Sequence, residues 1–83
     1  MADRISFVVN GRSVTLSRQE VERRMESVAP EAIRSHVVVI ADVRYPVKQV
    51  FAMVTGLDRL DFTSATARRL LAKLGFELAR DES

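Results

Sequence analysis

The stretch "ISFVVNGRSVTLS", Ile5 to Ser17, contains the strongest local fold signal in the chain. Two alternating runs rich in β-branched residues flank Asn10-Gly11, the pair that most readily takes positive φ at both central positions of a type I′ turn. A two-residue turn sets the cross-strand pairs Val9–Arg12, Phe7–Val14 and Ile5–Leu16. We therefore predict a β-hairpin and expect the face shared by the last two pairs to be buried.

A helix is predicted directly after this hairpin, in "SRQEVERRMESV". Ser17 is a suitable N-cap, Glu20 completes a capping box, and Leu16 can pack against Val21 as a hydrophobic staple. The inward stripe of this helix is Val21, Met25 and Val28. We expect Pro30 to end the helix and to begin a short turn over "PEAIRS".

The next segment, "HVVVIADVRYP", predicts two short strands joined at Ala41-Asp42, although that turn lacks glycine. Pro46 suits the first turn of a following helix, which Gly56 ends. The apolar positions of this helix recur at helical spacing, at Val47, Val50, Phe51 and Val54.

A last helix is predicted after the loop "LDRLDF", with Thr63 or Ser64 as its N-cap. Gly75 fits the left-handed position that follows a helix, and Phe76 can then close back on Leu71. The inner stripe of the helix is Ala67, Leu70, Leu71 and Leu74. The final "FELA" favours a short extended segment.

Together these elements predict an α+β fold, with an N-terminal hairpin, a helix, a second hairpin and two C-terminal helices around one core. The chain of 83 residues suits a single small domain spanning 1–83, with a polar tail at 80–83. The expected core residues are Ile5, Phe7, Val14, Leu16, Val21, Met25, Val50, Phe51, Val54, Leu70, Leu71, Leu74 and Phe76.

Composition narrows the classes of function. The chain has no cysteine, so a disulfide framework and a thiolate metal site are excluded, and the fold must rely on packing or on a partner chain. The longest apolar run, Val37 to Ala41, is too short to cross a bilayer, and the N-terminus does not resemble a signal peptide. We expect a soluble cytoplasmic protein with no membrane partner.

The formal net charge is only +2, but it is unevenly distributed along the sequence. Residues 44–73 hold six cations and two anions, giving +4, whereas the remaining residues hold seven cations and nine anions, giving −2. The cations of the second half are therefore the candidate contacts for a polyanion.

Six residues are the candidate nucleic-acid contacts. Arg68, Arg69 and Lys73 fall on the outer face of the last helix and form an uncompensated basic surface, which fits phosphate contact as well as ordinary solvation. Arg44, Tyr45 and Lys48 surround the start of the preceding helix, where a phenol can stack and a lysine can neutralise phosphate. The alternative for Tyr45 is packing at the hairpin edge, which is the commoner role of an aromatic side chain.

Catalytic and metal sites have little support in the sequence. Asp58 and Asp61 fit turn or cap positions better than a metal site, since no ligand cluster accompanies them. His36 has no Ser or Cys partner that spacing identifies, and its default role is a histidine at the start of a strand. We expect no enzymatic activity, no cofactor and no small-molecule substrate.

The second half of the chain, "VRYPVKQVFAMVTGLDRLDFTSATARRLLAKLGFEL", resembles a small module in the N-terminal regions of McrA-type modification-dependent HNH endonucleases and in small actinobacterial proteins of unknown function. The resemblance rests on Tyr45, Pro46, Lys48, Asp61, Phe62, Thr63, Ala67, Leu74, Gly75 and Phe76. It implies a module that accompanies DNA-acting enzymes, while the nuclease chemistry lies in a segment that this chain lacks. The loop "TSAT" departs from the glycines often found there, which puts backbone contact with phosphate at that loop in doubt.

Two hypotheses of function follow. The first is a non-enzymatic nucleic-acid-binding module, with DNA as the expected ligand. The second is a homodimeric protein-interaction module, in which Val37 to Ile40 offers an edge strand to a second copy of the chain.

Overall fold

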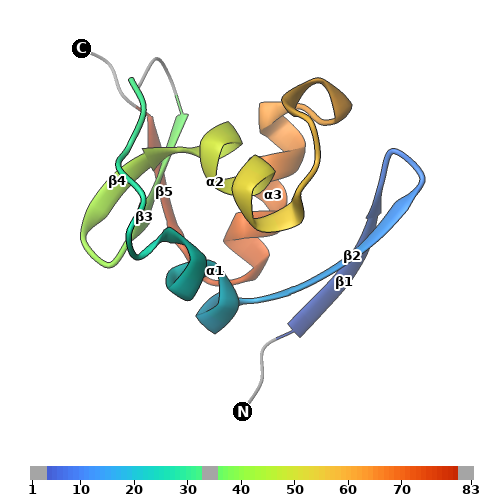
Figure 1. The fold of residues 1–83 in the computed structure, drawn as a ribbon, viewed down its shortest axis with the longest axis horizontal. Helices are drawn as coiled ribbons and strands as arrows, with labels where there is room; N and C mark the ends of the chain where they lie inside the picture. Colours follow the sequence, from blue (N-terminus) through green and yellow to red (C-terminus); the bar gives the residue numbers. More distant parts are fainter. Residues whose placement is uncertain (1–3, 33–35, 81–83) are drawn as a thin grey trace.

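The computed structural model describes residues 4–32 and 36–80 (Figure 1). The elements, in chain order, are β1 (Arg4–Val9), β2 (Arg12–Ser17), α1 (Arg18–Met25), β3 (His36–Ile40), β4 (Val43–Pro46), α2 (Val47–Thr55), the 3₁₀ turn η1 (Arg59–Asp61), α3 (Ser64–Lys73) and β5 (Glu77–Arg80). Helices α2 and α3 form a middle layer, with the β1–β2 hairpin on one side and a three-stranded sheet on the other (Figure 1). The predicted α+β class is confirmed.

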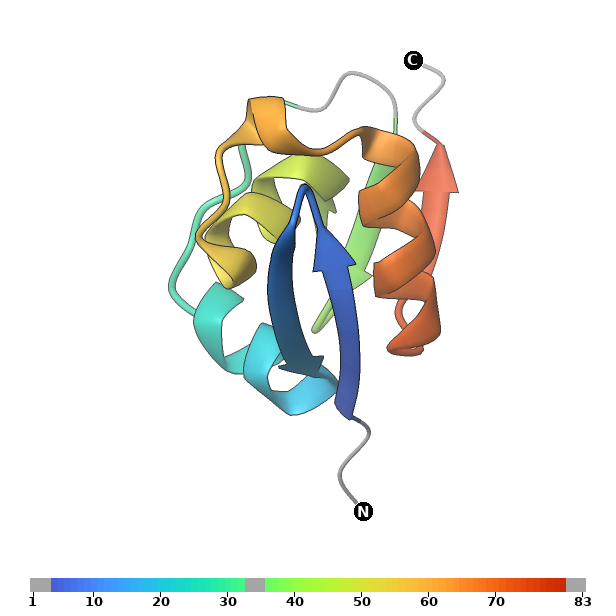
Figure 2. The same ribbon diagram turned by 90° about the vertical axis from the view of Figure 1, so that its right-hand side faces the viewer.

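The β1–β2 hairpin has the predicted turn and register. Asn10 and Gly11 take φ values of 50° and 80°, and Phe7 pairs with Val14. Leu16 is buried, but Ile5, Phe7 and Val14 are only partly buried, so the prediction that they belong to the closed core was too strong. The physical reason is that this two-stranded sheet lies at the edge of the molecule and is covered by helices on one face only (Figure 2).

Helix α1 begins as predicted and ends earlier than predicted. The Ser17 hydroxyl accepts the Glu20 backbone N–H at 3.1 Å, but the Glu20 carboxylate binds Arg24 at 3.3 Å, so the contact that the structure shows is one half of a capping box. The helix ends at Met25, well before Pro30, which corrects the predicted stop. Residues 30–32 are not helical, and the rest of the expected turn over "PEAIRS" lies outside the described residues.

The three-stranded sheet is antiparallel in the order β4-β3-β5. Strand β3 pairs with β4 through the predicted turn, in which Ala41 and Asp42 have φ values of 51° and 65° without any glycine. It also pairs with β5, which places Val39 opposite Glu77. The prediction that Val37 to Ile40 offers a free edge is therefore wrong, since β3 is the central strand.

The ends of α2 and α3 follow the local signals. Pro46 is the N-cap of α2 rather than a first-turn residue, and Gly56 ends the helix in the left-handed conformation at φ 74°. Thr63 caps α3 by accepting the Thr66 N–H at 3.2 Å. After α3, Gly75 has φ 93° and the Phe76 N–H bonds to the Leu71 carbonyl at 3.3 Å, which completes a Schellman motif.

The core joins the three layers. Its largest fully buried side chains are Phe51, Leu16, Met25, Leu71, Val21, Val37, Val38 and Val50. The ring of Phe51 lies 5.8 Å from that of Phe7 on the hairpin and 4.7 Å from that of Phe62, so an aromatic seam of three rings runs from the hairpin into the helical layer. Buried hydrophobic residues missing from the predicted core are Val9, Val37, Val38, Ile40, Tyr45, Val47, Leu57, Phe62 and Ala67.

The helices are short in the part of the chain that the structure describes. The longest helix, α3, has 10 residues, and no described helix is long and apolar enough to cross a membrane.

Candidate functional site

A hollow of about 630 Å³ lies where α3 passes the β3–β5 side of the sheet. Its charged and titratable lining residues are His36, Arg68, Arg69 and Arg80, and its other lining residues are alanines and Leu78. We call it the arginine hollow. Among the residues that the structure describes, the lining of this hollow is basic and apolar.

Three elements bring these side chains together. The antiparallel ladder sets His36 of β3 directly opposite Arg80 of β5, so both lie at the same end of the sheet. Helix α3 runs beside β5 (Figure 2) and turns its buried leucines to the core, which leaves Arg68 and Arg69 toward the hollow. Arg68 is half-buried, and its Nε donates to the Ser64 carbonyl at 3.4 Å.

The pKa of His36 is affected by the positive charges around the imidazole. Its pKa is lowered from 6.5 by partial desolvation first, and then by repulsion from Arg68 and Arg80. Since like charges lower the pKa of a base, the imidazole is held neutral by its own surroundings. An anion placed in the hollow would reverse that effect.

The ion pairs of the described residues lie elsewhere on the molecule. Their N···O distances are 3.6 Å for Arg18–Glu22, 3.3 Å for Arg24–Glu20 and 2.7 Å for Arg59–Glu31. Within residues 4–32 and 36–80, no carboxylate lies within ion-pair distance of the three hollow arginines or of Lys73.

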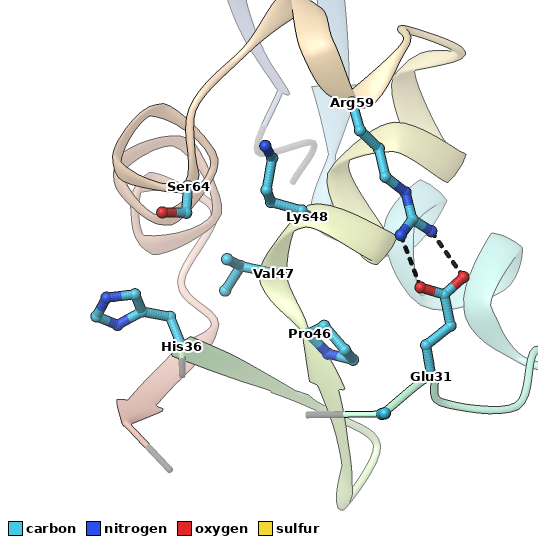
Figure 3. A pocket seen from close by; sticks show the side chains of 8 residues that line it. Glu31, His36, Pro46, Val47, Lys48, Arg59 and Ser64 are labelled. Atoms are coloured by element: carbon cyan, nitrogen blue, oxygen red, sulfur yellow. Dashed lines mark hydrogen bonds and ion pairs between the residues drawn. The ribbon is translucent and has the colours of Figure 1, made fainter. Parts of the chain in front are cut away.

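A second hollow, of about 390 Å³, adjoins the first and shares His36 with it (Figure 3). We call it the lysine hollow. His36 and Ser64 lie on one side, Val47 and Lys48 stand in the middle, and Arg59 with its bound carboxylate forms the other side (Figure 3). The first turns of α2 and α3 thus line the same depression.

The far wall of the lysine hollow is a bidentate ion pair. Arg59 Nη1 donates to Glu31 Oε1 and Arg59 Nη2 donates to Glu31 Oε2, each at 2.7 Å. This hydrogen bonding lowers the pKa of Glu31, because it favours the ionised form. The carboxylate is therefore neutralised locally and does not oppose an anion strongly.

Gln49 fixes the segment that supplies Glu31. Its side chain is 3% exposed, and it donates from Nε2 to the Ala29 carbonyl and accepts the Glu31 N–H at Oε1, both at 2.9 Å. A buried amide satisfied on both sides holds the loop backbone at a defined distance from α2. The two hydrogen bonds of Gln49 thereby position the backbone of Glu31 in the wall of the lysine hollow.

The structure separates the six predicted contact residues. Arg68 and Arg69 line the arginine hollow, and Lys48 lines the lysine hollow. Lys73 is exposed on the last turn of α3 and lines neither hollow. Arg44 is exposed on β4, on the opposite face of the sheet from its neighbour Tyr45.

Tyr45 has a structural role instead of the proposed contact. It is 4% exposed, and its hydroxyl lies 3.0 Å from the carbonyl oxygens of both Met25 and Val28. One phenol thereby holds the end of α1 and the segment after it against the sheet. A ring so enclosed cannot stack on a base, so the packing alternative is the one that the structure supports.

Two residues of the arginine hollow were missed from the sequence. Arg80 was assigned to the polar tail, and His36 was treated as an ordinary histidine at the start of a strand. No local pattern joins them, because their proximity depends on the pairing of strands far apart in the chain.

The predicted cap role of Asp58 is confirmed, since its Oδ1 accepts the Leu60 N–H at 2.9 Å. Across the described ranges, no cluster of three or more His, Asp or Glu side chains could hold a metal ion.

The fold is a small α+β domain with two adjoining hollows that share His36. The chain belongs to the SCO5918-like family, whose model matches residues 6–83. No curated protein and no solved structure matches the chain. The family match lends no support to the resemblance to McrA-type endonucleases.

Proposed function

We propose that this protein binds nucleic acid through its phosphate backbone, without catalysis, and that duplex DNA is its ligand. The observation that carries the proposal is the arginine hollow, whose described lining brings together Arg68, Arg69, Arg80 and His36. Guanidinium groups bind phosphate oxygens in bidentate geometry, and contacts of this kind supply most non-specific affinity for nucleic acid.

The distribution of aromatic rings favours a duplex over a single strand. Single-strand binders stack successive bases on exposed aromatic side chains. Here Phe7 is half-buried, and the other four aromatic residues of the chain are buried. Those four are Tyr45, Phe51, Phe62 and Phe76. Affinity therefore rests on sugar and phosphate contacts, which a duplex presents in a regular array.

The small net charge sets the strength of this binding. At +2 overall, long-range attraction is weak, so binding depends on the local cluster and falls as salt rises. We expect measurable binding at low ionic strength and a shallow dependence on sequence, since phosphate contacts position a protein but do not read bases.

Fluorescence anisotropy with a labelled duplex and the matching single strand, across a salt series, tests the proposal. The triple variant Arg68→Ala, Arg69→Ala and Arg80→Ala should weaken binding, and the slope of log affinity against log salt should fall by about one for each phosphate-contacting cation removed.

The matched control removes three cations from other surfaces. Arg4, Arg12 and Arg23 are exposed residues of β1, β2 and α1, so the variant with alanine at all three has the same net charge as the hollow variant. The control should bind nearly as wild type does. Equal losses in the two variants, or no wild-type binding at low salt, would contradict a site in the arginine hollow.

A further inference from the structure

The lysine hollow adds a second, chemically different site beside the arginine hollow. We propose that it binds a phosphomonoester, the terminal phosphate of a nucleic-acid strand whose backbone lies in the arginine hollow. The inference rests on the proposed function for the source of the phosphate, but the chemistry of the hollow stands on its own residues.

Three residues with hydrogen-bond donors, from three elements, line this hollow (Figure 3). Lys48 of α2 supplies an ammonium, His36 of β3 an imidazole and Ser64 of α3 a hydroxyl. In the described part of the chain, neither the Lys48 ammonium nor the Ser64 hydroxyl has a hydrogen-bond partner. A phosphomonoester carries a charge between about −1.5 and −2 near neutral pH and three acceptor oxygens, which matches this set of donors.

Lys48 is held in place by packing. It is half-buried, and its Nζ lies 5.4 Å from the centre of the Phe62 ring. A cation over an aromatic face is attracted to it without losing its hydrogen-bond donors. The ammonium at the rim of the hollow therefore keeps its N–H groups for an oxygen anion.

The one carboxylate of the wall does not oppose this binding. Glu31 is paired through both oxygens to Arg59, so the pair adds no net charge to the hollow. Among the described lining residues, Lys48 then supplies the positive charge that has no paired carboxylate. The local balance therefore favours a compact anion.

The size of the lysine hollow and its position beside the arginine hollow suit the end of a nucleic-acid strand. The lysine hollow is the smaller and more enclosed of the two, and it offers a lysine point charge where its neighbour offers planar guanidinium groups. His36 lines both hollows, so a strand that follows the arginine hollow reaches the lysine hollow beyond the imidazole. A smaller hollow beside the arginine hollow suits a terminal phosphate better than a continuous backbone.

The test compares short duplexes that differ only in their ends, carrying hydroxyl groups, 5′-phosphates or 3′-phosphates. Wild-type protein should bind one phosphorylated duplex about tenfold more tightly than the hydroxyl duplex, as expected for one hydrogen-bonded charge contact. Lys48→Met keeps the aliphatic stem on Phe62 and removes the charge, so it should reduce that preference to about one.

Lys73→Met is the matched control, because it removes the same charge from an exposed site outside both hollows. It should preserve the preference for a phosphorylated end. Equal wild-type affinities for all three duplexes would overturn the terminal-phosphate site while leaving the proposed function intact. A preference that survives in Lys48→Met would also overturn it.

A second measurement separates failure of the site from failure of the proposed function. If no duplex binds, nuclear magnetic resonance titration with a nucleoside monophosphate, the matching nucleoside and inorganic phosphate tests the hollow alone. Shifts at His36, Lys48 and Ser64 with the monophosphate, but not with the nucleoside, would support phosphomonoester binding and assign its source to a free nucleotide. Shifts with inorganic phosphate of the same size would assign recognition to the phosphate group itself. No shift with either phosphate compound would overturn the site.

Discussion

His36 and Arg80 face each other as direct partners across the β3–β5 ladder, which sets an imidazole beside a guanidinium at one end of the sheet. Partial desolvation, and then the charges of Arg68 and Arg80, make protonation of His36 unfavourable. Among the described residues, the charged and titratable groups that line the two hollows around this imidazole are Arg68 and Arg69 of α3, Arg80 of β5, Lys48 of α2, and the Glu31–Arg59 pair across the lysine hollow.

The first prediction is that His36 titrates below its ordinary pKa of 6.5 in the free protein. Arg80→Ala and Arg68→Ala should each raise the pKa of His36 toward that value, because each removes a repelling charge. The imidazole proton shifts in a pH titration measure this directly. Lys73→Met should leave the pKa unchanged, and a wild-type midpoint at or above the ordinary value would contradict the prediction.

The same shift has a consequence for stability, with a fixed sign. The unfolded chain keeps the ordinary histidine pKa, so below that value it binds a proton that the folded state resists. The free energy of unfolding therefore falls as pH drops through the ordinary pKa, and the loss is complete below the lowered folded-state pKa. Urea unfolding of wild type and His36→Gln at about pH 8 and about pH 5.5 should show a smaller decrease in the variant.

The second prediction concerns the buried phenol. Tyr45→Phe keeps the ring and removes the hydroxyl that lies between the Met25 and Val28 carbonyls. Leaving buried acceptors without a donor should lower the free energy of unfolding by about 1–3 kcal/mol. Urea unfolding measures the loss, while the affinity of the folded variant for duplex DNA should match wild type. If the variant binds DNA more weakly but has the same stability, Tyr45 would be assigned to the DNA-contact surface after all.

The third prediction concerns two substitutions that should stabilise the folded state. Ala41 and Asp42 occupy both positive-φ positions of the second hairpin turn, where asparagine and glycine are favoured. The double variant Ala41→Asn, Asp42→Gly should raise the free energy of unfolding by about 1 kcal/mol and the thermal midpoint by about 4–8 °C. Differential scanning calorimetry tests it. The single variant Asp42→Asn, which leaves alanine in the first position, should gain less.

The fourth prediction compares two helix-ending glycines. Gly75→Ala and Gly56→Ala both place a side chain in the left-handed region, which costs about 1–2 kcal/mol. At Gly75 the added carbon would also lie 2.9 Å from the Arg18 Nη1, whereas at Gly56 nothing lies within 4 Å. Gly75→Ala should therefore be the more destabilising in urea unfolding.

Arg18 is the partner that distinguishes the two sites. Its Nη1 donates to the Gly75 carbonyl at 2.8 Å, and its guanidinium lies 4.9 Å from the Phe76 ring centre. In an Arg18→Ala background the additional cost of Gly75→Ala should shrink. An unchanged cost there would assign the whole effect to backbone conformation.

The parts of the fold that could be predicted from sequence depend on neighbouring residues. Some signals act within a few residues and can be recognised in short stretches of sequence. They are the Asn10-Gly11 turn, the Ser17 cap and the glycine after each C-terminal helix. The pairing of β3 with β5 joins residues about half the chain apart, and no short window contains it. The predicted free edge of β3 was wrong for that reason.

The candidate site was harder to predict for the same physical cause. Arg68 and Arg69 were found because they follow each other on one helix, but Arg80 and His36 join them only through the sheet. The burial of Tyr45 was equally hidden, since its two acceptor carbonyls belong to a segment 17 to 20 residues earlier. Strand alternation alone does not reveal which face another segment will cover.

The aromatic seam from Phe7 through Phe51 to Phe62 also shapes how the molecule holds together. The hairpin and the three-stranded sheet share no strand, so no backbone ladder connects them. Apart from the hydrogen bond that the Asn10 amide donates to the Asp61 carboxylate at 3.1 Å, the hairpin is held to the helical layer largely by apolar contact, which weakens on cooling. We therefore expect the hairpin to open before the three-stranded sheet, and amide exchange at low temperature should reveal that partial opening first.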